Sequence, residues 1–321
     1  MDLIYMNEAR ADIGVLKDCA LDLAFGADEN DFECKIASGN HCCEKKFFLY
    51  IEGTEYGGII DDLKIDTSAD EITYIGRTWH GILNSKILEP DAGEAYLIAS
   101  GEANAMLAML IQRMGLSELF RASDKDSGIT VKSYKMNRYI AGYDGMRKML
   151  KASGAKLNIK FTEGMVELSA VPFVDYSKDE QFDTDQIDFV VCEKGSPVNH
   201  VICLGKGELT ERMVRHVYAD AFGNITDSQV FTGLSEVVQV YENTTAESEE
   251  ELIQGGIDII KESWNANEVS IDFDADGTVY DIGDIVGAKE RITGIEVSAE
   301  VTKKIVTVKN DIITIQYKVG E

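Results

Sequence analysis

The aspartates of the string IDFDADGT, residues 271–278, have the clearest spacing for chemistry in this sequence. Asp274 and Asp276 stand where phosphatases that form an aspartyl-phosphate place a nucleophile and its acid/base partner. That chemistry needs a large α/β domain after the motif to supply a lysine and further acids. Only residues 279–321 follow, and their alternating pattern predicts strands. The sequence therefore favours a hairpin turn, with a phosphatase at Asp274 and Asp276 as the alternative.

The same string also begins like a calcium-binding loop. Asp272, Asp274 and Asp276 occupy loop positions one, three and five, and Gly277 occupies position six. Position twelve, where a bidentate glutamate should close the shell, is Gly283, and the flanking segments have the pattern of strands instead of helices. A turn rich in Asp and Gly explains the string better, and weak cation binding by the three aspartates stays open.

Two histidines stand where a small hydrolase could use them. His200 alternates with Val198 and Ile202 on an expected strand, and His80 follows Trp79 at a strand-to-helix corner. Neither belongs to a recognisable Ser/His/Asp or Cys/His signature. Buried polar side chains are usually hydrogen-bonded parts of a core or interface, so packing is the favoured interpretation and a hydrolase is the alternative.

The cysteines and the glycine-rich segment offer no ligand pattern. Cys34 precedes the run His41-Cys42-Cys43, but no CxxC pair occurs, and adjacent cysteines on a strand point to opposite faces. The glycines around Lys206 form a fragment of a phosphate-binding loop that lacks the earlier glycine and the Ser or Thr after the lysine. The sequence therefore predicts free thiols and no catalytic, cofactor-binding or metal-binding set of residues.

The charge balance is strongly acidic. The chain has 57 acidic and 31 basic residues, which gives a formal net charge of −26. Proteins that bind nucleic acids gain affinity from lysines and arginines that neutralise phosphates, so no stable nucleic-acid binding is expected. Solubility alone accounts for such a charge. A more specific interpretation is that part of this charge lines a surface along which polyanions pass without binding, because like charges repel.

Length and hydropathy predict a folded protein of several units without a membrane span. At 321 residues the chain can form two or three units with their own cores, and 45% hydrophobic residues with three prolines exclude a disordered chain. The longest apolar run, residues 105–111, is far shorter than the roughly 18 residues that a membrane span needs. The N-terminus has acids where a signal peptide has a basic region. We expect no integral membrane segment and synthesis in the cytoplasm.

The hydrophobic period divides the chain into three regions. Residues 1–98 have the period of two that is typical of strands and end with an amphipathic piece around Trp79 and Ile82. The strands expected there are Leu3–Met6, Ile13–Lys17, Phe47–Glu52, Gly58–Asp66 and Glu71–Gly76. Residues 99–185 predict an α+β unit with a helix that ends at Gly115, a helix around Met146 closed by Gly154, and a hairpin whose turn is 162–164.

Residues 186–321 return to strands. Segments 187–193 and 199–204 predict a hairpin with a turn at 195–197. Further strands are expected at 237–241 and at 213–220, where a helix is the alternative. A helical insertion at about 247–265 follows, with an acidic first turn that suits the helix dipole. The short alternating segments after it predict an antiparallel meander that curls into a small barrel.

Three blocks of the sequence resemble the tail-hub family of long-tailed phages and prophages, which includes hubs of phage-like contractile particles such as bacteriocins. The first block is GIIDDLKIDTSADEITYIGRTWHGILNSKIL, residues 58–88. The others are VNHVICLGKGELTERMVRHVYADAFGNI, residues 198–225, and the span 251–320, from ELIQGGIDIIKE to ITIQYKVG. The order and the spacing of the three blocks carry the resemblance.

The resemblance implies an α+β, mainly β subunit with two tube-like antiparallel β-barrel domains, residues 1–98 and 186–321, and the α+β unit 99–185 between them. Three subunits of a homotrimer then present six barrels to a hexameric tail tube or distal tail protein above, and threefold symmetry to a spike or tip protein below. This function is structural and places the protein in a virion or phage-like particle assembled in the bacterial cytoplasm. A receptor- or carbohydrate-binding β module is a further alternative.

Overall fold

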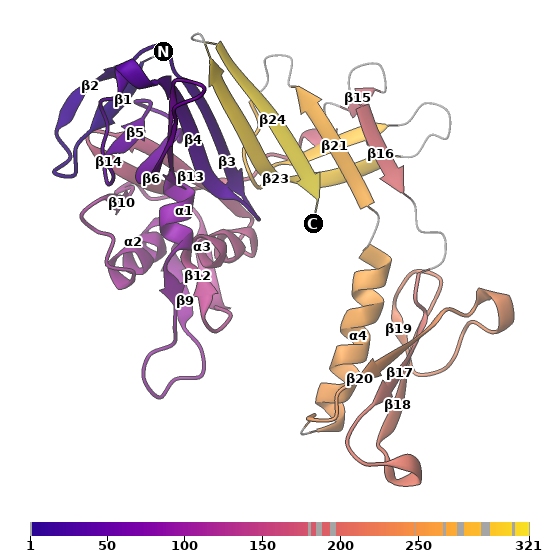
Figure 1. Cartoon of the computed structure of the whole chain (residues 1–321). Helices are drawn as coiled ribbons and strands as arrows, with labels where there is room; N and C mark the ends of the chain where they lie inside the picture. The colour runs from indigo at the N-terminus through magenta and orange to yellow at the C-terminus, as the bar shows by residue number, and fades with distance from the viewer. Residues whose placement is uncertain are drawn as a thin grey trace. The chain divides into compact units, whose positions relative to one another are not determined.

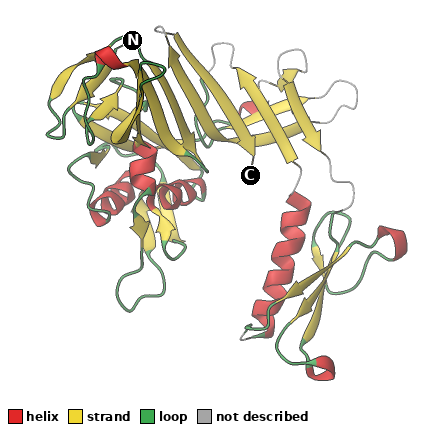
Figure 2. Cartoon of the chain, viewed as in Figure 1, coloured by secondary structure: helices red, strands yellow, loops and turns green. Residues whose placement is uncertain are grey.

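The computed structural model describes residues 2–178, 181–183, 188–192, 197–246, 248–265, 268–274, 279–289, 296–309 and 312–320. Strands outweigh helices, as expected for an α+β, mainly β chain (Figure 2). The chain forms two compact units: the first unit is Met1–Phe189 with Ser270–Glu321, and the second unit is Val190–Val269. The division into three domains at 98/99 and 185/186 stays a prediction.

The largest sheet joins strands from both ends of the chain (Figure 1). Its N-terminal strands are β1 (Leu3–Met6), β2 (Asp12–Leu16), β3 (Ala20–Gly26), β4 (Asn30–Ala37), β5 (Phe48–Tyr50), β6 (Gly57–Asp66) and β7 (Glu71–Thr78). The other strands are β15 (Gln181–Asp183), β16 (Asp188–Cys192), β21 (Glu268–Asp274), β22 (Ile285–Lys289), β23 (Glu296–Lys309) and β24 (Ile312–Gly320). The main path of the sheet is β16-β21-β24-β23-β3-β4-β7-β6-β5-β1-β2.

The long strand β23 is the junction between the two ends of the chain. Its residues Lys303–Lys309 pair antiparallel with β3, and its other edge pairs with β24. The strands assigned to two separate barrels therefore share one sheet. None of the sheets formed by the described residues closes on itself, so the tube-like barrels stay a prediction.

Two strands, β3 and β4, were not among the strands expected from the sequence. In β4 the buried residues Phe32, Cys34 and Ile36 alternate with exposed charged side chains, which is the signature of a half-buried strand. In β3 the buried run Leu23–Phe25 ends at Gly26, whose φ of 152° brings its backbone close to that of β23. Both strands face a core that also contains Leu49, Ile60, Tyr74 and Val306.

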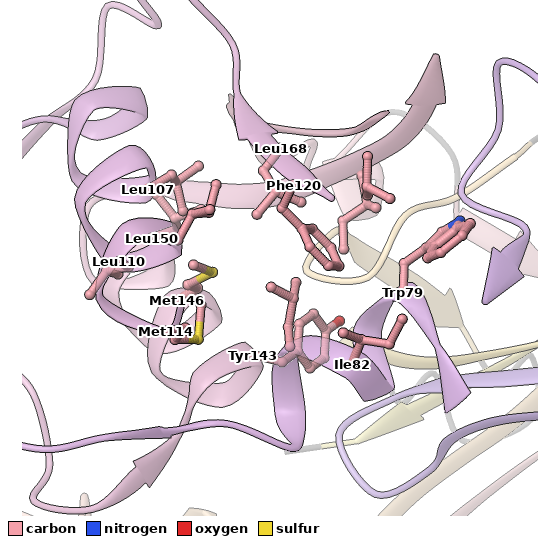
Figure 3. Packing of buried hydrophobic residues seen from close by; sticks show 14 of the residues in the cluster. Trp79, Ile82, Leu107, Leu110, Met114, Phe120, Tyr143, Met146, Leu150 and Leu168 are labelled. Carbon is pink, nitrogen blue, oxygen red and sulfur yellow. The ribbon is translucent and has the colours of Figure 1, made fainter. Parts of the chain in front are cut away.

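A second core contains buried side chains of three helices together with Met6, Phe48 and Tyr50 of β1 and β5 (Figure 3 shows part of it). The helices are α1 (Trp79–Asn84), α2 (Ala103–Arg113) and α3 (Gly142–Lys151). They pack with the strands β8 (Ile87–Leu88), β9 (Ile98–Glu102), β10 (Phe120–Ala122), β11 (Thr130–Lys135), β12 (Ile140–Ala141), β13 (Ala155–Thr162) and β14 (Met165–Pro172). The helix ends at Gly115 and Gly154, both with positive φ, and the β13–β14 hairpin are as expected.

The second unit is a four-stranded sheet with one helix against it. Its strands are β17 (His200–Leu204), β18 (Val214–Ala219), β19 (Ile225–Thr226) and β20 (Val238–Glu242), in the order β19-β18-β17-β20, and its helix is α4 (Glu249–Asn265). The apolar stripe of α4 packs through Leu252 and Ile260 on Val201, Cys203 and Val217 of the sheet. Short 3-10 turns lie at Ser38–Asn40, Tyr176–Lys178, Leu209–Glu211 and Gly233–Ser235.

The hairpin expected from segments 187–193 and 199–204 is wrong. The first segment forms β16, which pairs with β21 in the largest sheet, and the second forms β17, which pairs with β18 and β20. Strand β17 is the centre of its own sheet because α4 covers Val201 and Cys203 on one side of it. Long-range burial thus decided the pairing of a strand whose local turn signal favoured its sequence neighbour.

Candidate functional site

The aspartate string falls partly outside the described residues. Asp272 and Asp274 lie on β21, whereas Asp276 and Gly277 are outside the residues that the structure describes. Both the phosphatase pair and the cation loop need Asp276, so each remains an alternative to the hairpin turn, as the sequence left it.

The structure instead brings together a buried group of charged residues that no sequence motif indicated. We call it the charge network: Glu55, Lys156, Asp281, Asp284 and Lys304. Lys304 lies on β23, Lys156 lies on β13, Glu55 precedes β6, and the two aspartates form the turn before β22. Lys304 and Asp284 are each only 1% exposed. Four sections of the chain therefore meet at one set of ion pairs in the first unit.

Lys156 is held by both aspartates of the turn. Its Nζ donates to Asp284 Oδ1 and Oδ2 at 2.8 and 2.7 Å and to Asp281 Oδ2 at 2.8 Å. Asp284 also accepts hydrogen bonds from the backbone N–H groups of Val174 and Asp281. Every oxygen of the buried Asp284 carboxylate thus has donors, which offsets the cost of removing its charge from water.

Lys304 extends the network toward the N-terminal part of the chain. Its Nζ donates to Asp281 Oδ1 at 2.8 Å and to Glu55 Oε1 at 2.7 Å. Burial disfavours the charged lysine, but the two carboxylates outweigh it and raise the pKa of Lys304 above its ordinary 10.5. Burial likewise opposes ionisation of Glu55 and Asp281, yet Lys304 lowers the pKa of both carboxyl groups, together with His80 at Glu55 and Lys156 at Asp281. All three groups are therefore charged at neutral pH.

His80, the first histidine considered for hydrolysis, lies at the edge of this network. Its Nε2 is 3.5 Å from Glu55 Oε2, and its ring stacks on Phe25 at 4.4 Å between centroids and meets the edge of Tyr143. Burial lowers the pKa of His80 below 6.5, although Glu55 acts in the opposite direction. A neutral imidazole packed between aromatic rings serves the core, and no hydroxyl or thiol of the described residues hydrogen-bonds to it.

His200, the second candidate, pairs with another histidine in the second unit. His200 Nε2 lies 2.8 Å from His216 Nδ1, and His200 Nδ1 lies 2.7 Å from Glu236 Oε1. Gln229 donates to the same glutamate oxygen at 2.7 Å. A catalytic histidine would activate a nucleophile, but neither ring is hydrogen-bonded to a hydroxyl or thiol within the described part of the chain. The sequence pattern placed His200 on a strand correctly and missed His216 and Glu236 as its partners.

The cysteines and His41 surround one tyrosine. Tyr74 Oη accepts from the backbone N–H groups of Cys42 and Cys43 at 3.2 Å each and lies 3.1 Å from His41 Nδ1. Cys34 and Cys43 are free and buried, and burial raises the pKa of the Cys43 thiol. Among the described residues no three His, Cys, Asp or Glu side chains cluster as metal ligands. Cys34, Cys43 and Tyr74 are part of the core that β3 and β4 face.

The glycine-rich segment around Lys206 is part of a hairpin. Gly205 and Lys206 pair through backbone hydrogen bonds with Met213, at 2.8 and 2.9 Å, so this segment continues the β17–β18 hairpin. In the described ranges, none of the helices is long and apolar enough to cross a membrane.

Whole-chain comparisons of the fold return proteins of phage tails. A 43 kDa tail protein of prophage MuSo2 from Shewanella oneidensis superposes with a TM-score of 0.55 at 10% identity, covering 100% of this chain and 98% of that chain. Prophage tail protein gp18 of Listeria monocytogenes EGD-e gives 0.52 at 11% identity, covering 99% and 94%. A chain of the phage P2 baseplate gives 0.51 at 10% identity, covering 99% and 98%.

No family model matches the sequence, and no curated protein sequence matches it. At 10–11% identity the likeness concerns the fold, and it extends over the full length of both chains in each pair. The resemblance that three sequence blocks indicated is thereby confirmed for the fold, which is similar to those of prophage tail proteins and of a baseplate chain.

Proposed function

We propose that this chain is a structural hub at the tip of a phage-type tail or contractile injection particle. Three copies form a ring that adapts a hexameric tail tube, or a distal tail protein, to a trimeric spike or tip protein. The observation that carries the proposal is the full-length likeness in fold to prophage tail proteins and to a phage baseplate chain. Its place is the tail tip or baseplate of a virion or phage-like particle.

The edge of the largest sheet supports assembly between copies. Strand β2 has one neighbour, β1, in the strand order of the described residues. Its outward side chains Ile13 and Val15 are 52% and 41% exposed. An open apolar edge strand invites pairing with another chain, so strands from neighbouring copies can continue the sheet around a ring. In this arrangement each subunit contributes two tube-like barrel domains, and three subunits contribute six.

The acidic surface suits a ring through which a polyanion passes. A net charge of −26 repels phosphates and shortens their residence on the wall. The charge network adds a rigid joint between the N-terminal and C-terminal strands of the first unit, since its five charged groups connect four sections of the chain. A rigid, acidic subunit is suited to assembly.

The subunit count in solution tests the proposal. Native mass spectrometry of the full chain, alone and mixed with tube and spike proteins from the same gene cluster, should give a trimer in at least one mixture. Ile13→Asp should weaken that trimer because it places a charge at the edge of β2. Ile65→Asp, at an exposed site on the inner strand β6, is the matched control and should leave the trimer intact. An exclusive dimer or tetramer would contradict the ring.

Catalysis calls for a separate experiment. We expect no turnover of p-nitrophenyl phosphate with Mg²⁺ and no binding of duplex DNA at physiological salt. Turnover that Asp274→Asn abolishes would replace the structural proposal with the phosphatase alternative. Specific retention on immobilised bacterial surface glycans by a monomeric protein would favour the receptor- or carbohydrate-binding alternative.

A further inference from the structure

The sheet of the second unit has one covered side and one uncovered side. Val201, Cys203 and Val217 face α4, so the alternate residues of the same strands face the opposite way. We call this opposite side the open face. The register aligns its central residues across three strands: Ile202 lies beside His216 and Val240, and His200 lies beside Val238.

The open face is apolar and accessible. Val214, Val238 and Val240 on it are 37%, 46% and 56% exposed. The second unit as a whole has eight of the nineteen exposed large hydrophobic side chains of the described residues, although it is about a quarter of the chain. Three of these eight, the valines above, lie together on the open face, and neighbouring exposed apolar side chains of this kind mark an interaction surface.

The buried histidine of the open face, His200, already has hydrogen-bond partners. Both nitrogens of His200 have partners, one in His216 and one in Glu236, and Gln229 also binds that glutamate. A partner that covers these groups would not leave a new unpaired donor or acceptor on them, which removes the usual penalty for burying a polar centre. Covering the open face therefore leaves no unpaired ring nitrogen at His200.

The net charge of the second unit indicates the kind of partner. The second unit contains fourteen acidic and five basic residues. Glu236 lies two residues before β20 and Glu242 ends this strand, and both border the apolar residues. Glu236 is hydrogen-bonded to His200, and Glu242 is paired with Arg212. A second copy of this chain would bring the same acidic border, and a nucleic acid would bring phosphates. Both are disfavoured by like-charge repulsion.

We propose that the open face is the docking site for a different protein, whose contact surface is apolar at its centre and carries lysine or arginine at its margin. The valines supply the buried centre, and the acidic border supplies orientation and rate of association. This inference goes beyond the ring proposed above, and its test does not depend on the number of subunits in that ring.

The test uses the full chain and a displayed library of random peptides as the probe. Peptides that bind the native protein are selected first, and their binding to Val240→Asp is then measured. This variant places an unpaired charge in the centre of the open face. The matched control is Gln239→Asp, which adds the same charge to the same strand on the side that faces away from it. Val240→Thr, which keeps the β-branched shape, should reduce binding in the same direction if the aspartate variant folds poorly.

The expected binders have apolar centres and basic flanks. Their affinity should fall at least tenfold with Val240→Asp, stay unchanged with Gln239→Asp, and fall similarly when glutamate replaces their flanking lysines. High salt should weaken the binding of these peptides, because it screens the attraction between their basic flanks and the acidic border. A library that yields no peptide dependent on Val240, or dependent peptides without basic flanks, would overturn the inference. So would self-association in sedimentation velocity that Val240→Asp alone abolishes, because a second copy would then cover the open face.

Discussion

Lys304 Nζ and Glu55 Oε1 lie 2.7 Å apart although 249 positions separate them in the sequence. Lys304 belongs to the strand β23 that joins the C-terminal strands to β3, and Glu55 lies in the N-terminal part of the same unit. The pair thus connects the two ends of the chain where water has little access to the lysine. Removing either partner leaves a charge that the surrounding core cannot solvate.

Lys304→Met should destabilise the first unit by about 3–5 kcal/mol, because Glu55 and Asp281 keep their charges and lose their shared cation. Urea unfolding followed by the emission of Trp79, in a Trp264→Phe background, reports on the first unit alone, since the chain has two tryptophans. Lys45→Met is the control: Lys45 forms an exposed pair with Asp62 at 3.2 Å, and its loss should cost about 0.5 kcal/mol or less. Equal costs for the two variants would show that the network does not stabilise the fold.

Acid should destabilise the first unit in two stages. Burial lowers the pKa of His80 below 6.5, so the stability contributed by its neutral form is complete above that value and is lost as the pH falls through the folded pKa. Burial opposes ionisation of Glu55 and Asp281, but the lysines lower the pKa of both below 4.5 and 3.8, so their contribution is lost at still lower pH.

Urea midpoints measured from about pH 7 to about pH 3 should therefore fall steadily. The Lys304→Met variant should show a shallower fall below pH 4.5, because its carboxyl groups no longer have the cation that lowers their pKa. A stability curve for the native protein that is flat over this range would contradict the assignment of charged states.

Gly256→Ala should destabilise the second unit even though alanine favours helices. A Cβ at Gly256 would lie 2.5 Å from Cys203 Sγ and 3.0 Å from Val217 Cγ2, so α4 would have to move away from the sheet. Overpacking of this kind costs about 1–3 kcal/mol, against a gain of about 1 kcal/mol in helix propensity.

Hydrogen–deuterium exchange followed by mass spectrometry separates the two units in this experiment. Peptides of α4, β17 and β18 should exchange faster in Gly256→Ala, and peptides of the first unit should not change. Gly320→Ala, where a Cβ meets no atom within 4 Å, is the control. Slower exchange in Gly256→Ala would show that propensity outweighs the close approach of helix and sheet.

Truncation after Asn310 should cause aggregation or loss of assembly. It removes β24, which pairs with β23 and β21 and buries Tyr317 and Val319, while Ile313 and Ile315 are half-buried. Tyr317 Oη also accepts the backbone N–H of Tyr280 at 3.1 Å. Full burial of such a side chain is worth about 1.5–3 kcal/mol.

The controls for the truncation are charge changes on the exposed side of the same strand. Gln316→Glu and Lys318→Glu should leave folding and assembly intact, because both side chains are exposed. Size-exclusion profiles and circular dichroism melts compare the variants. A truncated chain as soluble, cooperative and able to assemble as the full chain would mean that β24 is dispensable.

The sequence by itself determined the local elements of this protein. Alternation of apolar and polar residues located β1, β6 and β24, and glycines after helical periods located the ends of α2 and α3. These signals are local, since side-chain period and backbone conformation depend on neighbouring residues. The alternation of Phe32, Cys34 and Ile36 in β4 was also readable and was missed.

The tertiary structure alone decided which elements pair and which charges meet. Strand β17 pairs with β20 instead of forming the hairpin that the turn signal before it predicted. Strand β23 pairs with β3, which lies near the other end of the chain. The one sequence sign of the charge network is that Lys304 shares a strand face with the buried Val306 and Val308. The residues that pair with Lys304 are distant from it in sequence, and ion pairs leave no periodic pattern in a sequence. Only the fold brings Glu55, Asp281 and Lys304 within hydrogen-bonding distance, because burial of apolar surface sets the arrangement of the strands that carry them.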